Sequence, residues 1–344
     1  MTKQGQSLKR TLQLIADILS FDSSYEQLQK DLNENPNWDA MVSTGSKHLM
    51  LPAIYCRLWQ KDLLKYLPEE LTMYLKEVTD LNRDRNTRLL EEAQQVSKLF
   101  DEHQIVHVYL KGIALIAGDY FEDIAERMIG DIDILIASDQ LDKAFDLLVA
   151  QGYDDFIKFN YEVKNYRHYP RQIAAHRLGA IELHGQLLKH GFNHLMASEI
   201  VLANKQLGQQ IPIPNTEHLI RNAIYANQIN DRHSYLGSIH LKGIYDVLVL
   251  KLPDQPQLIS TLSSQLHSNR FLNLSSIFFP SLSPRGCYDG SIYRRIFLVS
   301  MHFPKFGRLL YNLKKMLWDL QDRLGIFASN QSYRKHVLKK LPFK

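Results

Sequence analysis

The feature that most constrains this chain is the segment 130–136, GDIDILI, in which acidic and apolar residues alternate. Side chains two residues apart on a strand point to the same face of the sheet. Asp131 and Asp133 therefore share one face, and the isoleucines of the segment share the other. A face made of isoleucine packs well in a core. The segment thus predicts a strand over 132–136 with an acidic pair at its start.

The residues around this segment predict a small mixed sheet with helices packed on it. Residues 105–110, IVHVYL, have the β-branched and aromatic character of a buried strand. A turn at Lys111-Gly112 and a helix over about 113–121 follow. Further along, we predict a helix over 140–150 and strands over 156–159, 166–169 and 180–184. The order β-α-β-α-β-β-β is that of a small α+β unit.

Helical patterns flank this unit on both sides. Apolar residues recur at helical spacing over most of 8–103, and helices are predicted again from 216 and over 239–250. The segment 253–284, rich in Ser, Leu and Pro, carries no clear signal. We therefore predict an α+β protein with four regions: an N-terminal helical region (1–104), a core (105–185), a helical region that completes the core (186–252), and a C-terminal helical region (253–344).

The composition is that of a soluble globular protein. Of its residues, 45% are hydrophobic and 23% are charged. The length of 344 residues is enough for one large domain or two ordinary domains. The two cysteines, Cys56 and Cys287, fit no zinc spacing and no disulfide framework. The first residues are polar, and no apolar run reaches the ~18 residues of a membrane span. We expect a cytoplasmic protein without a transmembrane segment.

The last 54 residues, 291–344, differ from the rest in charge. They hold twelve Lys or Arg against Asp319 and Asp322, a net charge of +10, whereas the whole chain carries +4 and the remainder therefore −6. Aromatic and leucine residues alternate with the cations over 303–318. Two interpretations stay open: a solvated basic helix packed on the body through its apolar stripe, or a surface that binds an anionic membrane or an acidic partner.

The paired aspartates suggest a divalent-metal site. Two carboxylates this close repel each other unless a cation lies between them. Mg²⁺ prefers oxygen ligands and bridges the phosphate oxygens of a nucleotide. Glu182, placed between Ile181 and Leu183 where an unpaired acid is costly, is the best third ligand. The plain alternative makes Asp131 a turn residue, Asp133 a half-exposed strand residue and Glu182 a surface residue.

Several of these motifs together resemble one known family. It is the uncharacterised bacterial nucleotidyltransferase family of the DNA polymerase β-like superfamily, and the resemblance covers about residues 40–250. The motifs are Leu110-Lys111-Gly112, Tyr120, Arg127, Asp131-Ile132-Asp133-Ile134-Leu135-Ile136 and Ile181-Glu182-Leu183-His184. The resemblance implies that the turn at Gly112 lies beside the triphosphate. It also implies that Asp131 and Asp133 bind two Mg²⁺ ions, and that Glu182 is the third carboxylate.

Other residues near these motifs each have two interpretations. Lys111 can reach a phosphate or be solvated, and Arg127 can contact the triphosphate or pair with an acid. His184 lies on the same strand face as Glu182, where it can contact the nucleotide, orient a carboxylate or serve the structure. Asp246 resembles an aspartate on a downstream helix of the family, or it is a buried acid with a partner.

The resemblance implies transfer of a nucleoside monophosphate from an NTP, with ATP favoured, to a hydroxyl-bearing acceptor such as a sugar, a metabolite or a protein. One alternative is an NTP-binding regulatory protein with weak or no turnover. Ile113 in place of the second small residue of the turn, and Glu rather than Asp at 182, favour it. Another alternative is an accessory protein of cell-surface polysaccharide or peptide biosynthesis that lies on the membrane through its basic tail.

Overall fold

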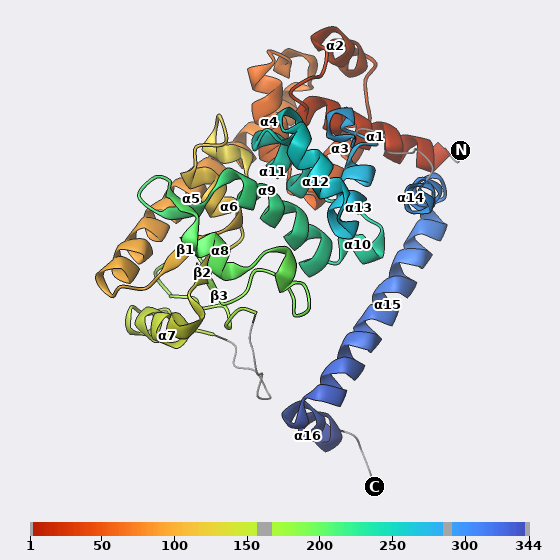
Figure 1. Cartoon of the computed structure of the whole chain (residues 1–344). Coiled ribbons are helices and arrows are strands. Elements are labelled where there is room, and N and C mark those ends of the chain that lie inside the picture. The colour runs from red at the N-terminus through yellow and green to blue at the C-terminus, as the bar shows by residue number, and fades with distance from the viewer. Residues whose placement is uncertain (1–2, 157–166, 285–290, 341–344) are drawn as a thin grey trace.

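The N-terminal part of the chain is helical, as the periodicity predicted. The structure is a computed structural model that describes residues 3–156, 167–284 and 291–340. Its first hundred residues form α1 (Lys3–Leu19), α2 (Tyr25–Asn33), α3 (Trp38–Lys47), α4 (Leu51–Gln60) and the long α5 (Glu69–Glu102). In Figure 1 these helices cover one side of the molecule, and α5 runs past the sheet.

The sheet at the centre is small and mixed, which confirms the predicted α+β class. It consists of β1 (His107–Tyr109), β2 (Ile132–Ile136) and β3 (Ile181–His184), with β2 in the middle. β1 pairs antiparallel with β2, and β2 pairs parallel with β3. All five residues of β2 are buried. Strand β2 therefore has the bounds that the alternating segment predicted.

The prediction of a separate turn at Lys111-Gly112 is wrong, because both residues belong to a helix. Helix α6 spans Lys111–Ala117, so Gly112 lies in its first turn rather than ahead of the helix. Lys111 has a φ of 53°, and this left-handed residue lets the chain change from strand to helix within one position. The helix also ends earlier than predicted, at Ala117, because Gly118 and the left-handed Asp119 follow. Helix α7 (Leu141–Ala150) agrees with its prediction.

The two strands predicted over 156–159 and 166–169 fall mostly on residues 157–166, which lie outside the described residues. Their neighbours make isolated antiparallel bridges instead of named strands. Asp155 pairs with Ile173, Gln172 with Ile181, and His168 with His184. The segment 168–172 therefore runs along the free edge of β3.

After the sheet the chain is again largely helical. Helices α8 (Ser198–Ala203), α9 (Thr216–Tyr225), α10 (His233–Leu236), α11 (Leu241–Val249), α12 (Pro256–Ser263) and α13 (Leu266–Ser275) follow one another. The sequence did not predict the two-stranded sheet of β4 (Lys205–Leu207) and β5 (Pro212–Pro214), because three residues are too few to show alternation. Nor did it predict α12 and α13, whose Ser and Asn have low helix propensity. Buried Phe271 and Leu272 show that tertiary packing stabilises α13.

The C-terminal helices lie at the edge of the body of the protein and contact it to different extents. Helix α14 (Ile292–His302) buries Phe297 and Met301, whereas no residue of α15 (Pro304–Ser329) is buried. Figure 1 shows α15 extending along the side of the body to α16 (Gln331–Lys340). The interpretation in which the basic helix packs on the body through its apolar stripe is therefore wrong for α15. Among the described helices, none combines the length and apolar character that crossing a bilayer requires.

Polar side chains of α5 hold the segments that lead into the central strands. The amides of Asn82 and Asn86 donate hydrogen bonds to the carbonyl oxygen of Arg127, at 3.3 and 2.8 Å. Buried Glu92 accepts hydrogen bonds from the hydroxyl of Tyr153 at 2.6 Å and from the amide of Gly179 at 2.9 Å. Because Gly179 lies two residues before β3, Glu92 holds the segment through which the chain enters β3.

Replacing Glu92 by alanine should therefore destabilise the whole core. The substitution leaves the buried hydroxyl of Tyr153 and the amides of Leu178 and Gly179 without an acceptor. We expect Glu92→Ala to lower the free energy of unfolding by about 2–4 kcal/mol in urea denaturation. Glu91→Ala, on the exposed side of the same helix, is the matched control and should change it by less than about 0.5 kcal/mol. Equal effects of the two substitutions would contradict the role of Glu92.

Candidate metal and nucleotide site

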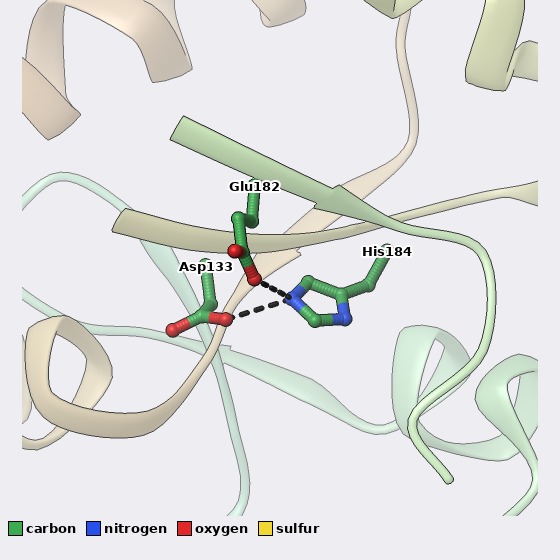
Figure 2. A group of neighbouring side chains, drawn as sticks. All are labelled: Asp133, Glu182 and His184. Atoms are coloured by element: carbon green, nitrogen blue, oxygen red, sulfur yellow. Dashed lines mark hydrogen bonds and ion pairs between the residues drawn. The ribbon is translucent and has the colours of Figure 1, made fainter. Parts of the chain in front are cut away.

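The acidic residues meet because β2 and β3 are parallel and in register. Asp133 lies directly opposite Glu182 in the sheet, and Asp131 precedes Asp133 by two residues on the same face. His184 follows Glu182 by two residues and shares that face as well. Figure 2 shows Asp133, Glu182 and His184 pointing toward one another from the two strands. One ligand atom from each of these three residues lies within 4.8 Å of the others.

Asp133 is the most constrained of the carboxylates. It is only 1% exposed, and its Oδ1 accepts hydrogen bonds from Lys111 Nζ at 2.6 Å and His184 Nε2 at 2.7 Å. Burial by itself raises the pKa of Asp133. The charge of Lys111 and the hydrogen bond from His184 outweigh burial and hold that pKa well below its usual range. Asp133 is therefore ionised and fixed in orientation.

Asp131 and Glu182 both contact the guanidinium group of Arg171. Arg171 Nη2 lies 2.7 Å from Asp131 Oδ2 and 3.1 Å from Glu182 Oε1. Burial and the neighbouring charge of Asp133 raise the pKa of Asp131. The three carboxylates thus gather negative charge, which the half-exposed Arg171 and Lys111 balance. The cluster has the electrostatic character of a cation site.

The donor set fits a divalent metal ion. Asp133 and Glu182 supply carboxylate oxygens to the group that converges within 4.8 Å, and oxygen ligands are those that Mg²⁺ prefers. Asp131 does not belong to that group among the described residues and adjoins it through Arg171, so its place as a metal ligand stays a prediction. His184 could also ligate a metal, because Nε2 lies 3.7 Å from Glu182 Oε2 and points into the cluster. The hydrogen bond of that nitrogen to buried Asp133 makes it an orienting group instead. Nδ1 of His184 is buried and has no hydrogen-bond partner among the described residues.

A cavity of about 280 Å³ adjoins the acidic cluster. Lys111 and Asp131 belong to both the cluster and the cavity wall, so the two features are continuous. The wall carries four basic side chains and several amides and acids. Its polar residues are Lys111, Arg127, Asp131, Arg167, Asn222, Asn227, Asn230, Asp231, His240, Lys242 and Asp246. A polyanionic ligand fits such a wall better than an apolar one does.

Arg127 is on this wall but is also paired with an acid. Its Nε and Nη2 lie 2.7 and 2.9 Å from the two carboxylate oxygens of Asp246, and both side chains are buried. Nη1 donates to the carbonyl oxygen of Met128 at 2.6 Å. The pair joins the loop before β2 to α11. It confirms that Arg127 pairs with an acid and that Asp246 is a buried acid with a partner. Contact between Arg127 and a nucleotide stays a prediction.

Close packing around position 112 requires a small residue there. A Cβ atom at this position would lie 2.9 Å from Ile129 Cγ1 and 3.7 Å from Arg127 Nη1, so no larger residue fits without displacing its neighbours. The residues that line the cavity in the described part of the chain do not include Gly112. The place of Gly112 beside the triphosphate therefore stays a prediction. The contact with Ile129 explains why the residue is a glycine.

Sequence reasoning missed three basic residues at the site. Arg171 contacts the acids, and Arg167 and Lys242 line the cavity. No local pattern marks the two arginines, which lie next to a segment of ambiguous character. Lys242 had one signal: it precedes Asp246 by four residues, which places both on one helix face.

The comparison with known proteins agrees with this geometry. Residues 34–273 match the family described as uncharacterised nucleotidyltransferase, so the chain belongs to that family and the resemblance is confirmed. No curated protein matches the sequence. Membership supports a transferase of the nucleotidyl class, and the acidic cluster lies inside the matched region.

The pair of Arg127 and Asp246 should show strong coupling in a double-mutant cycle. Asp246→Leu leaves the guanidinium of Arg127 buried without a counterion, and Arg127→Met leaves the carboxylate equally unpaired. We expect each single substitution to lower the free energy of unfolding by about 3–5 kcal/mol. The double variant should be more stable than either single variant, because it buries no unpaired charge. Additive losses in urea denaturation would show that the two residues act independently.

Proposed function

We propose that this protein is a Mg²⁺-dependent nucleotidyltransferase that moves a nucleoside monophosphate from an NTP, with ATP favoured, to a hydroxyl-bearing acceptor. The observation that carries the proposal is the continuity of the acidic cluster with the basic cavity. Asp131 contributes to both, as does Lys111. A nucleotide with its triphosphate in the cavity would bring its phosphate oxygens against the three carboxylates. The family supports this class of reaction.

Asp131, Asp133 and Glu182 would hold the metal. Mg²⁺ bound there supplies positive charge to the phosphate oxygens and lowers the pKa of the acceptor hydroxyl. His184 keeps the carboxylate of Asp133 in one orientation through the bond from Nε2. Lys111, which now contacts Asp133, lies at the border of the cavity and would pair with a phosphate oxygen.

The triphosphate would lie against Lys242 and Arg167. Burial, and next the charge of Arg127, lower the pKa of Lys242 to about 8. Burial is the larger cause, so the lowered pKa reflects chiefly the cost of holding a charged ammonium away from water. A polyphosphate placed there would pair with the ammonium of Lys242 and stabilise its charged form, which favours binding.

The reaction would be an in-line displacement at the α-phosphorus. The acceptor oxygen forms a bond to that phosphorus, and its proton passes to the carboxylate of Glu182, which lies at the edge of the cluster. The bond between the α-phosphorus and the bridging oxygen breaks, and pyrophosphate leaves with the electron pair. The basic wall of the cavity faces the charge that develops on the pyrophosphate.

A second candidate is an NTP-binding protein without turnover. The contact of Arg171 with both Asp131 and Glu182 favours it, because those carboxylates are already neutralised by a side chain of the protein. In this case NTP would still bind the basic wall. The two candidates therefore differ in pyrophosphate release and agree in nucleotide binding.

Removing the acidic pair should abolish the effect of the metal. In isothermal titration we expect ATP to bind the parent protein more tightly with Mg²⁺ than without it. Asp131→Ala/Asp133→Ala should remove that difference. Pyrophosphate release in the presence of a cell extract should fall by at least about 100-fold in the same variant. Asp139→Ala, an exposed acid just beyond β2, is the matched control and should behave as the parent does.

Two results would count against parts of this proposal. If the double variant binds Mg-ATP as tightly as the parent, the acidic cluster is not the metal site. If the parent binds Mg-ATP but releases no pyrophosphate with any NTP or extract, the protein is the non-catalytic binder.

Lys242 should make nucleotide affinity depend on pH. Its pKa is about 8 in the free protein, and bound triphosphate would raise it, so binding takes up a proton above that pH. Affinity for ATP should therefore be highest below pH 8 and fall by up to about tenfold per unit as the pH rises. In Lys242→Met the affinity should be lower and this pH dependence should disappear. Lys251→Met, beyond the end of α11, should keep the parent profile, and an unchanged profile in Lys242→Met would exclude the contact.

A further inference from the structure

Helix α15 presents a continuous apolar face that the body leaves uncovered. It is 26 residues long and buries none of them. Six large apolar side chains recur every three or four residues along it, and all of them are exposed: Phe306, Leu309, Leu313, Met316, Leu320 and Leu324. At 100° per residue these positions form one stripe. A stripe of this size on a soluble surface indicates a binding face.

The opposite face of α15 is the one that contacts the body. Trp318 lies against Tyr235 of α10, with their ring centroids 4.9 Å apart. Asp319 pairs with Arg232 at 2.7 Å, and Asp322 lies 3.9 Å from the same guanidinium. At 100° per residue, Trp318 and Asp322 lie roughly half a turn from Leu309 and Leu320 around the helix axis, and Asp319 lies about a quarter of a turn from them. The body therefore holds α15 from one side and leaves the apolar stripe directed away from it.

Helix α14 repeats this arrangement. Its buried residues, Phe297 and Met301, are on one face. Ile292, Ile296 and Val299 are on the other face and are exposed. Both helices thus have an anchored side and an apolar exposed side.

The charge of this segment selects the class of partner. Residues 291–344 carry +10, and the two acids among them, Asp319 and Asp322, face Arg232 on the body. The acids are therefore paired within the molecule. Two of the cations also contact the body: Lys314 donates to the carbonyl oxygen of Leu236 and Arg294 to that of Asn273. By helical position Lys305 and Arg323 both lie beside one edge of the apolar stripe, where their stems can lie along an apolar phase while their charges reach its polar boundary.

We propose that α14 and α15 bind an anionic lipid surface, with the apolar stripe in the interface and the flanking cations against acidic headgroups. This combination of an apolar face, a basic edge and exposed length is that of an interfacial helix. A second copy of the chain is a poorer occupant, because two such basic helices side by side would repel each other. The proposal is independent of the reaction at the acidic cluster.

Vesicle flotation of the full chain tests the proposal. The protein should float with vesicles of phosphatidylcholine and phosphatidylglycerol in equal parts, but not with vesicles of phosphatidylcholine alone. Added salt should weaken the binding. In Leu309→Glu/Leu320→Glu the bound fraction should correspond to an affinity at least about tenfold lower. Because α15 buries no residue, this variant should keep the thermal midpoint of the parent.

The matched control is Met73→Glu/Leu81→Glu, which places the same charges on two similarly exposed apolar residues of α5. It should float as the parent does. The proposal is overturned if the parent ignores anionic vesicles, if it binds neutral vesicles equally well, or if Leu309→Glu/Leu320→Glu floats unchanged. A dimer in light scattering that this variant disrupts, together with no vesicle binding by the parent, would assign the face to a second copy of the chain instead.

Discussion

The parallel pairing of β2 with β3 is the constraint on which the site depends. Its register sets Asp133 opposite Glu182, and the two-residue period of each strand then adds Asp131 and His184 to the same face. A slip of one residue would turn Glu182 and His184 to the other side of the sheet. The acidic cluster is therefore a property of two strands in register: β2 supplies Asp133, β3 supplies Glu182 and His184, and Asp131 lies directly before β2.

Helix α5 enforces that register from outside the sheet. Its asparagines hold the loop before β2, and Glu92 holds the two amides just before β3. The pair of Arg127 and Asp246 then ties the same loop to α11, which carries Lys242. Scaffold and cavity wall are thus joined by buried polar contacts, and these are more directional than apolar packing. The N-terminal helical region positions the site even though it contributes no residue to the cluster.

The chain also separates its charges in space. The body is acidic overall and gathers carboxylates at the sheet, whereas the last 54 residues carry the excess of positive charge. The few acids of the C-terminal helices are turned toward Arg232 on the body. As a result, the carboxylate cluster lies at the sheet, whereas the basic segment lies in the C-terminal helices.

The sequence by itself determined the local features. Alternation at 130–136 predicted β2 with its true bounds, and the shared face of Asp131 and Asp133 follows from strand geometry alone. Only the tertiary structure decided which distant groups meet them. Arg171, 40 residues from Asp131, and Asp246, 119 residues from Arg127, are brought in by folding and leave no local pattern. The same reason applies to α15: its periodicity showed an apolar stripe, but only the packing of its opposite face on α10 decided that the stripe stays exposed.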